Sequence, residues 1–229
     1  MADLNLADKL LLLALDDDKG TFTAQPFALT YGMAGSILLE LSLQEHIKIV
    51  DKKVVANTMS RINDSLLDKY LDVIRNSKKE RSLKYWVQKL GSKQRTIKNE
   101  ILDKLIASGI LVKKEKKVLW VFNNDVFPTV NSKPENSLRN QLYNVIEGNK
   151  TSDLDELMLI SLIDTCNLNR TVYGKERAKA CKANIKKVIS DAKNSQIISA
   201  TVKEVHDIIL AMLVVVISSS IVATTAATN

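Results

Sequence analysis

The stretch 95–128 constrains the fold most, because it combines three patterns within one short piece of chain. In its first half, apolar residues recur at helical spacing at Ile97, Ile101, Leu102, Leu105 and Ile106. Gly109 follows where a left-handed C-terminal cap is needed. Two β-prone runs, 110–112 and 118–122, flank the charged segment Lys113–Lys117, which predicts a hairpin with the lysines at its turn. The stretch therefore predicts a helix followed by a basic hairpin.

Two features of this helix-hairpin unit predict an anionic ligand. Arg95 and Lys98 are three residues apart, so they share a face at the helix start, where the free amides and the macrodipole are already positive. An oxyanion bound there would turn repulsion into binding. The run 118–122 is apolar on both faces of its strand, and the second face needs lipid, a partner chain or more of the same fold. Ordinary solvated charges and a central strand of a sheet are the alternative interpretations.

Composition indicates the fold class. The chain has 229 residues, 45% of them hydrophobic and 26% charged, which is enough to bury a sizeable core. Seven glycines and three prolines are few for a sheet-rich fold with many tight turns, and the long apolar runs have the helical period. We therefore expect a mainly α fold, a single globular helical-bundle domain over residues 1–229 with small β-hairpins.

Local signals place most of the expected elements. Asn5, Asp64 and Asp153 are expected N-caps, and a small hairpin is expected at 46–56. Besides the helix of the central unit, the expected helices are Leu4–Leu15, Tyr31–Leu43, Ser65–Ile74, 83–91, 132–148, Leu154–Ile163 and 175–192.

Positive charge is concentrated around the central unit. The segment from Lys78 to Lys117 holds thirteen Lys or Arg against four Asp or Glu, a net +9, whereas the whole chain carries +7. Such a local patch predicts an anionic partner, either phospholipid headgroups or nucleic acid. A second basic face, formed by Lys175, Lys179, Lys182 and Lys186, carries no interleaved aromatic residue and is interpreted as a solvated helix face.

Cysteines, histidines and catalytic motifs predict no chemistry. Cys166 and Cys181 are isolated, which argues against a disulfide framework or a metal site and favours a reducing compartment. His46 and His206 have no acidic or cysteine ligands in a metal-binding pattern. Phosphate-loop, nucleotide-binding glycine, nucleophile-elbow and zinc-protease motifs are absent from the sequence. We expect no catalytic residue, no metal, no cofactor and no enzymatic activity.

The C-terminal segment 208–229 permits two interpretations. It contains no charged residue, and 208–217 is strongly apolar, so its length and hydropathy are just sufficient for a C-terminal membrane anchor. Serines and threonines weaken the last third, and no basic or aromatic belt brackets the segment. A buried terminal helix is the favoured interpretation, and the anchor stays open.

Several segments together resemble the Golgi phosphoprotein 3 family, in order and over nearly the whole chain. They are Leu4–Asp16, Gly32–Leu41, Tyr85–Leu90 and Leu102–Leu111, followed by the hairpin and Phe127–Pro128. The resemblance implies one mostly helical domain without enzymatic activity. It also implies a peripheral membrane protein that recognises phosphatidylinositol 4-phosphate on the cytosolic face of the Golgi and acts as an adaptor for glycosyltransferases and the coat machinery.

The family's site residues carry over only in part. Arg95 and Lys98 occupy the basic pair that grips the phosphate, whereas the family's pocket tryptophan and second arginine fall on Gln25 and Ala34. This departure puts specificity for phosphatidylinositol 4-phosphate in doubt. The family's hydrophobic hairpin tip, which serves membrane insertion or self-association, falls on Lys117, Val118, Leu119 and Trp120. The family's basic N-terminal extension has no counterpart before Leu4, as expected for a reduced or bacterial-type member.

Three functional hypotheses follow. The first is a membrane-surface module in the cytoplasm that binds anionic phospholipid through Arg95 and Lys98, with membrane-protein cargo or a second copy as further partners. Its hairpin contacts would be Lys113, Lys114, Lys116, Lys117, Leu119 and Trp120. The second is a winged-helix nucleic-acid binder with 96–108 in the groove, which the apolar run and the extent of the resemblance disfavour. The third is a tail-anchored or scaffolding protein that uses 208–222.

Overall fold

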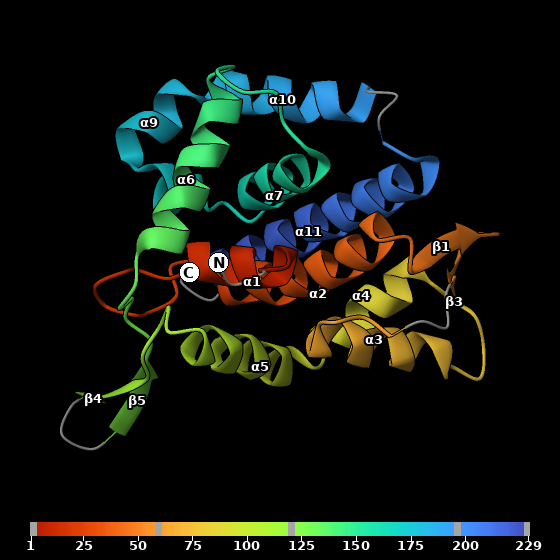
Figure 1. The fold of residues 1–229 in the computed structure, drawn as a ribbon, viewed down its shortest axis with the longest axis horizontal. Coiled ribbons are helices and arrows are strands. Elements are labelled where there is room, and N and C mark those ends of the chain that lie inside the picture. Colours follow the sequence, from red (N-terminus) through yellow and green to blue (C-terminus); the bar gives the residue numbers. More distant parts are fainter. Residues whose placement is uncertain (1–3, 58–60, 119–121, 195–197, 227–229) are drawn as a thin grey trace.

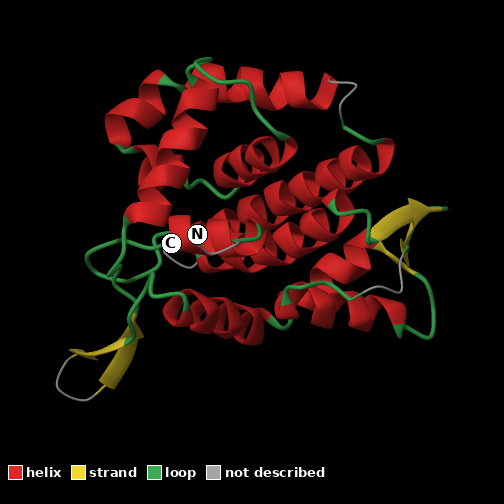
Figure 2. Ribbon diagram, in the orientation of Figure 1, coloured by secondary structure: helices red, strands yellow, loops and turns green. Residues whose placement is uncertain are grey.

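A computed structural model describes residues 4–57, 61–118, 122–194 and 198–226. Over these ranges the chain forms eleven helices and two small antiparallel sheets, which confirms the predicted mainly α class (Figures 1 and 2). The helices are α1 Leu6–Leu13, α2 Pro26–Leu43, α3 Ser65–Arg75, α4 Leu83–Gly91, α5 Gln94–Ala107, α6 Lys133–Ile146, α7 Leu154–Thr165, α8 Asn169–Tyr173, α9 Lys175–Ala180, α10 Lys182–Asn194 and α11 Ala200–Ala226. The strands are β1 Ile47–Val50, β2 Lys53–Ala56, β3 Arg81–Ser82, β4 Lys114–Val118 and β5 Phe122–Val126.

Helix α2 is the centre of the core. It packs against α1, α4 and α11, and Figure 1 shows α6, α7 and α10 on one side of it and α3 and α5 on the other. The consecutive residues Ile37, Leu38 and Leu39 are all fully buried, as expected of a helix surrounded on every side. Helix α2 is long and apolar enough to cross a membrane, but 72% of it is buried within the fold, as in a core helix. It begins at Pro26, five residues before the expected start, because proline suits the first helical position.

Side-chain caps fix three helix starts where the sequence predicted them. Asn5 and Asp8 form a capping box on α1, and Asp153 and Glu156 form another on α7. Asp64 caps α3 by accepting hydrogen bonds from two backbone amides. Asn5 Nδ2 also donates to Asp64 Oδ2 at 2.9 Å, which ties the start of α1 to the start of α3.

Helix α11 packs on α2 as part of the core. Val205, Ile209 and Leu213 are fully buried, and an added Cβ on Gly35 of α2 would lie 2.6 Å from Ile209 Cγ2. The absence of a side chain at Gly35 therefore allows the two helices to approach closely. This packing supports the buried interpretation of the C-terminal segment up to Leu213, and the side chains from 216 onward lie outside the described ones.

The β1–β2 hairpin is close to its expected position. Its turn residues Asp51 and Lys52 have φ of 50° and 62°, the pair of positive values that a type I′ turn requires. A third strand, β3, pairs antiparallel with β2 through Lys53 with Ser82 and Val54 with Arg81. The sequence did not predict β3, because a two-residue strand carries no periodic signal. The expected helix at 175–192 is in fact two helices, α9 and α10, which meet at Cys181.

The β4–β5 hairpin corrects the predicted turn. The strands pair antiparallel from Lys114 with Val126 to Val118 with Phe122, so Lys114–Lys117 lie in β4 and Lys113 directly precedes it. The prediction that Lys113–Lys117 forms the turn is therefore wrong. The apolar run 118–122 is likewise not one strand, because it covers the end of β4, the connection 119–121 and the start of β5. That connection lies outside the described residues.

Both cysteines are buried in the helical core. Cys166 and Cys181 are free thiols, each 2% exposed. Burial raises the pKa of the Cys166 thiol to about 12. Burial also raises the pKa of Cys181, and a hydrogen bond to Glu147 adds to the effect.

Candidate functional site

A small pocket lies between the start of α5 and the start of α2. It has a volume of about 210 Å³ and contains one cationic side chain, that of Lys98. Its lining consists of Phe22, Ala24, Pro26, Leu29, Thr30, Met33, Gln94 and Lys98. Three pieces of chain therefore meet here: the loop after α1, the first turns of α2 and the first turns of α5. We call this site the α5 pocket.

The walls of the α5 pocket are held by specific contacts. The Lys98 ammonium lies over the ring of Phe22, 5.2 Å from its centroid, a cation–π contact that fixes the charge at the pocket wall. Thr30 Oγ1 donates to the carbonyl of Pro26 at 2.7 Å and also contacts Gln94 Oε1. The start of α2 is thereby joined to the start of α5.

The first turn of α5 is strongly cationic. Its N-cap is Lys93, which makes no side-chain cap hydrogen bond in the described structure, and its first turn holds no acidic residue. Arg95 is exposed, and neither Arg95 nor Lys98 forms an ion pair with any described residue. Free backbone amides and unpaired cations together create a local positive potential that favours an anion.

The two departures from the family pattern lie in different surroundings. Gln25 is the exposed N-cap of α2, and its sequence neighbours Ala24 and Pro26 line the α5 pocket while Gln25 does not. Ala34 lies inside α2 and is fully buried, one residue beyond the lining residue Met33. The pocket thus brings Lys98 together with the loop near Gln25, whereas Arg95 is exposed in the first turn of α5 and does not line the pocket. Ala34 is not presented at the surface.

The hairpin residues lie on a projection that follows α5. Lys113 is half-exposed and pairs with Asp125 across the base of the hairpin, with Nζ 2.9 Å from Oδ2. Lys114, Lys116, Lys117 and Val118 lie in β4, and Leu119 and Trp120 fall in the connection outside the described residues. Figure 1 shows the hairpin extending from the same edge of the molecule as α5.

The loop between α1 and α2 holds the base of the hairpin. Phe127 N donates to the carbonyl of Gly20 at 2.8 Å, and Thr129 N donates to the carbonyl of Asp17 at 3.1 Å. The same loop supplies Phe22 to the α5 pocket. The pocket and the hairpin are therefore positioned by one shared segment, which the sequence alone did not indicate.

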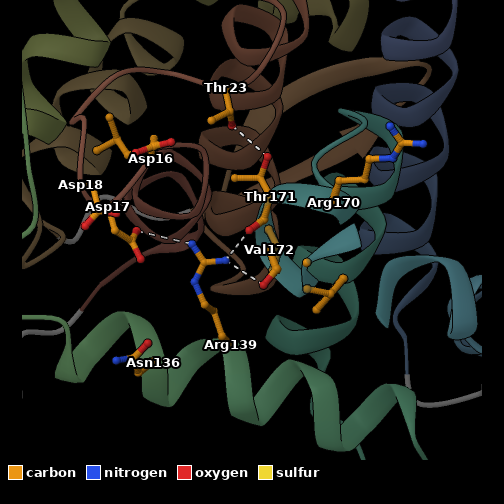
Figure 3. A pocket seen from close by; sticks show the side chains of 12 residues that line it. Asp16, Asp17, Asp18, Thr23, Asn136, Arg139, Arg170, Thr171 and Val172 are labelled. Atoms are coloured by element: carbon orange, nitrogen blue, oxygen red, sulfur yellow. Dashed lines mark hydrogen bonds and ion pairs between the residues drawn. The ribbon is translucent and has the colours of Figure 1, made fainter. Parts of the chain in front are cut away.

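A larger cleft of about 580 Å³ lies around Arg139 (Figure 3). Arg139 Nη1 donates to the carbonyls of Thr171 and Val172, each at 2.7 Å, and Nη2 lies 3.7 Å from Asp17 Oδ1. Arg139 also donates to the carboxylate of Glu135. These contacts join α6, α8 and the loop after α1 through the guanidinium, so Arg139 has a structural role at this cleft.

Glu135 is the most perturbed carboxyl beside this cleft. It is 1% exposed, and burial raises its pKa to about 7; Arg139 opposes the shift and the charge of Asp17 adds to it. The folded state therefore holds a proton between the ordinary pKa of 4.5 and about 7, whereas the unfolded state has released it. By linkage, this group makes stability fall as pH rises through that window, by at most about 3 kcal/mol.

Replacing Glu135 with glutamine should remove this pH dependence. The amide stays neutral at every pH and keeps an oxygen for Arg139, so the slope of unfolding free energy against pH between about 5 and 7 should largely disappear. Urea unfolding at a series of pH values measures the slope. Glu176→Gln, on the exposed surface of α9, is the control and should keep the wild-type slope. An unchanged slope in Glu135→Gln would assign the proton to another group.

Among the residues that the structure describes, no group of three or more His, Cys, Asp or Glu side chains is arranged to hold a metal ion.

The fold and the α5 pocket together define a class of protein: a helical domain with a projecting hairpin on one edge and a cationic helix start, where Arg95 and Lys98 form no ion pair with the described residues. Residues 6–209 match the family model for Golgi phosphoprotein 3 (GPP34), and the chain belongs to this family. The vacuolar protein sorting-associated protein 74 of Eremothecium gossypii is 21% identical over a match of 164 residues, and the coverage is 62% of this chain and 49% of that protein. The chain thus matches about half the length of this relative.

Proposed function

We propose that this protein is a peripheral membrane-binding module that recognises anionic phospholipid headgroups through Arg95, Lys98 and the first turn of α5. One observation carries the proposal: at a helix start without a side-chain cap, Arg95 and Lys98 have no carboxylate partner among the described residues, and Lys98 lines a pocket. A headgroup phosphate would supply the missing negative charge and accept hydrogen bonds from the free amides. The role is one of binding rather than catalysis.

The hairpin would strengthen the attachment. Strand β4 contains Lys114, Lys116 and Lys117 around the single acidic residue Glu115, and each basic residue near an anionic surface contributes about 1 kcal/mol. Leu119 and Trp120 of the connection are proposed to enter the interfacial region, where aromatic side chains are favourable. A second copy of the chain is the alternative partner for this hairpin.

The finer specificity is also a proposal. The family description, Golgi phosphoprotein 3, and the name of the relative in Eremothecium gossypii, a vacuolar protein sorting-associated protein, support a membrane-trafficking role. As the family resemblance implies, we propose phosphatidylinositol 4-phosphate as the headgroup and membrane proteins as cargo at the Golgi cytosolic face. Gln25 offers an amide where the family has an aromatic residue, and Ala34 offers no charge. We therefore expect a weaker preference among anionic headgroups than a complete family pocket would give.

Vesicle co-sedimentation tests the proposal. Neutral vesicles, anionic vesicles and anionic vesicles containing phosphatidylinositol 4-phosphate are compared for the wild type and for Arg95→Ala/Lys98→Ala. Loss of two cations should reduce affinity for anionic vesicles by about thirtyfold, and added salt should weaken wild-type binding. Loss confined to phosphoinositide vesicles would indicate headgroup recognition, and equal loss on all anionic vesicles would indicate a charge patch.

Lys175→Ala/Lys179→Ala is the matched control. It removes the same charge from the exposed helix α9, which lies at the opposite edge of the molecule from α5 in Figure 1. This control should bind nearly as the wild type does. Unaltered binding by Arg95→Ala/Lys98→Ala would remove the two residues from the mechanism. Tighter binding to duplex DNA than to anionic vesicles at the same salt would favour the nucleic-acid alternative.

A further inference from the structure

A second hollow lies on the other side of the first turn of α5. It has a volume of about 230 Å³ and is enclosed by α3, the end of α4 and the start of α5. Its lining consists of Lys69, Tyr70, Val73, Lys89, Leu90, Lys93 and Thr96. Gln94 and Lys98 line the α5 pocket while Lys93 and Thr96 line this hollow, so a single helical turn separates the two.

The hollow combines an apolar floor with a cationic rim. Tyr70 and Leu90 are 4% and 1% exposed and form the floor, and Val73 is 39% exposed at its edge. Lys69 lies 5.5 Å from the Tyr70 ring centroid and is already paired with Glu100.

Two rim charges remain available. Lys89 and Lys93 are exposed, and neither forms an ion pair within the part of the chain that the structure describes. The hollow thus presents the cations of Lys89 and Lys93 next to an apolar surface. A ligand that matches both features is anionic and carries an apolar part directly beside the negative group.

We propose that this hollow is a second anionic phospholipid site. The phosphate would lie between Lys89 and Lys93, and the glycerol and first methylenes would cover Tyr70 and Val73. The volume is below the range of about 300–1,000 Å³ that drug-sized ligands occupy, so it suits only the part of a lipid next to its phosphate. The inference rests on the proposed membrane function, because it places the hollow beside the same bilayer as the α5 pocket.

Two adjacent lipid sites would change how binding depends on membrane composition. The first bound lipid holds the second site at the surface, so the second capture takes place at high effective concentration. Binding should therefore rise more steeply than in proportion to the fraction of anionic lipid. Loss of the second site should leave a shallower, proportional dependence.

The vesicle experiment uses Lys89→Ala/Lys93→Ala across a series of anionic-lipid fractions, with Lys175→Ala/Lys179→Ala as the charge-matched control. We expect about a tenfold greater loss of affinity than in the control, together with loss of the steep dependence. A second variant tests the apolar edge without removing a cation. Val73→Glu should weaken binding, whereas Val50→Glu, at a similarly exposed valine of β1, should weaken it less.

Calorimetry with soluble dihexanoyl phosphatidic acid tests lipid binding by the hollow in the absence of a membrane. Calorimetric binding of this lipid should be reduced by Lys89→Ala/Lys93→Ala and by Val73→Glu. If the wild type fails on vesicles but keeps this binding, the membrane function falls and the lipid site stands. If the wild type binds vesicles and Lys89→Ala/Lys93→Ala behaves as its control, the second site is overturned and the α5 pocket stands. Equal affinity for inorganic phosphate, or binding of an acidic peptide in place of the lipid, would also overturn it.

Discussion

Replacing Lys104 with methionine should lower the free energy of unfolding by about 3–5 kcal/mol. Lys104 of α5 pairs with Asp8 of α1 and with Asp64 at the start of α3, and its Nζ lies 2.6 Å from Asp64 Oδ2. The Asp8 side chain is fully buried and that of Asp64 is 14% exposed. Methionine fills a similar volume but leaves both carboxylates without their cation.

The pKa directions in this cluster predict how the loss depends on pH. Burial raises the pKa of Asp8 even with Lys104 present, whereas hydrogen bonds from Lys104 and from backbone amides lower the pKa of Asp64 against the effect of burial. Without Lys104 both folded-state pKa values should rise, so the penalty should be largest at neutral pH and should shrink as the carboxyls protonate.

Urea unfolding of Lys104→Met at neutral and acidic pH measures this effect. Lys69→Met is the control, because Lys69 pairs with Glu100 at the surface between α3 and α5 and should cost less than about 1 kcal/mol. Equal losses in the two variants would show that burial of the Asp8–Lys104–Asp64 cluster does not determine its contribution to the free energy of unfolding.

Replacing Gly20 with alanine should cost about 3 kcal/mol and should displace the hairpin. Gly20 has a φ of 61°, and a Cβ there would lie 2.3 Å from the backbone nitrogen of Pro128 and 2.4 Å from backbone atoms of Phe127. The obstacle is main chain rather than a flexible side chain, so the segment leaving β5 must move. The hydrogen bond from Phe127 N to the Gly20 carbonyl should be lost with it.

Gly109→Ala separates backbone strain from this collision. Gly109 has a φ of 67° and nothing within 4 Å of an added Cβ, so alanine there should cost only about 1 kcal/mol. Thermal or urea unfolding compares the two variants. Gly20→Ala should also bind anionic vesicles more weakly than Gly109→Ala, because the hairpin no longer keeps its orientation to α5. Equal behaviour of the two variants would contradict the assigned role of the loop.

Helices could be predicted because their signals are local. The apolar period of α5 and the caps Asn5, Asp64 and Asp153 are determined by neighbouring residues in the sequence, and the structure confirms them. Gly109 after α5 has the expected left-handed conformation. The Gln25–Pro26 step was a usable signal for the start of α2 that the apolar pattern alone did not reveal.

The sequence pattern of the hairpin differs from its structure for a physical reason. Strand β4 projects from the body of the molecule, so it needs no buried face and tolerates the charged sequence that usually marks a turn. Apolar residues instead lie at the end of β4 and the start of β5. If charged segments are taken as turns and apolar runs as strands, the predicted turn falls at Lys113–Lys117, whereas β4 continues to Val118.

Contacts between distant segments were beyond sequence reasoning. Lys104 meets Asp8 and Asp64 only after α1, α3 and α5 have packed, and Gly20 meets Phe127 only when the hairpin returns to the loop after α1. The spacing of Arg95 and Lys98 predicts their common position at the start of α5, and the anion there stays a prediction. The role of Phe22 as a ring beneath Lys98 could not.

The burial of both native thiols makes the protein directly suitable for site-specific labelling. Thiolate is the reactive form, and Cys166 and Cys181 are both enclosed with pKa values raised by burial. A cysteine introduced at the exposed position Asp125 would therefore react first with a maleimide fluorophore, without removal of either native cysteine. A polarity-sensitive dye there would report directly whether the hairpin leaves water when vesicles are added.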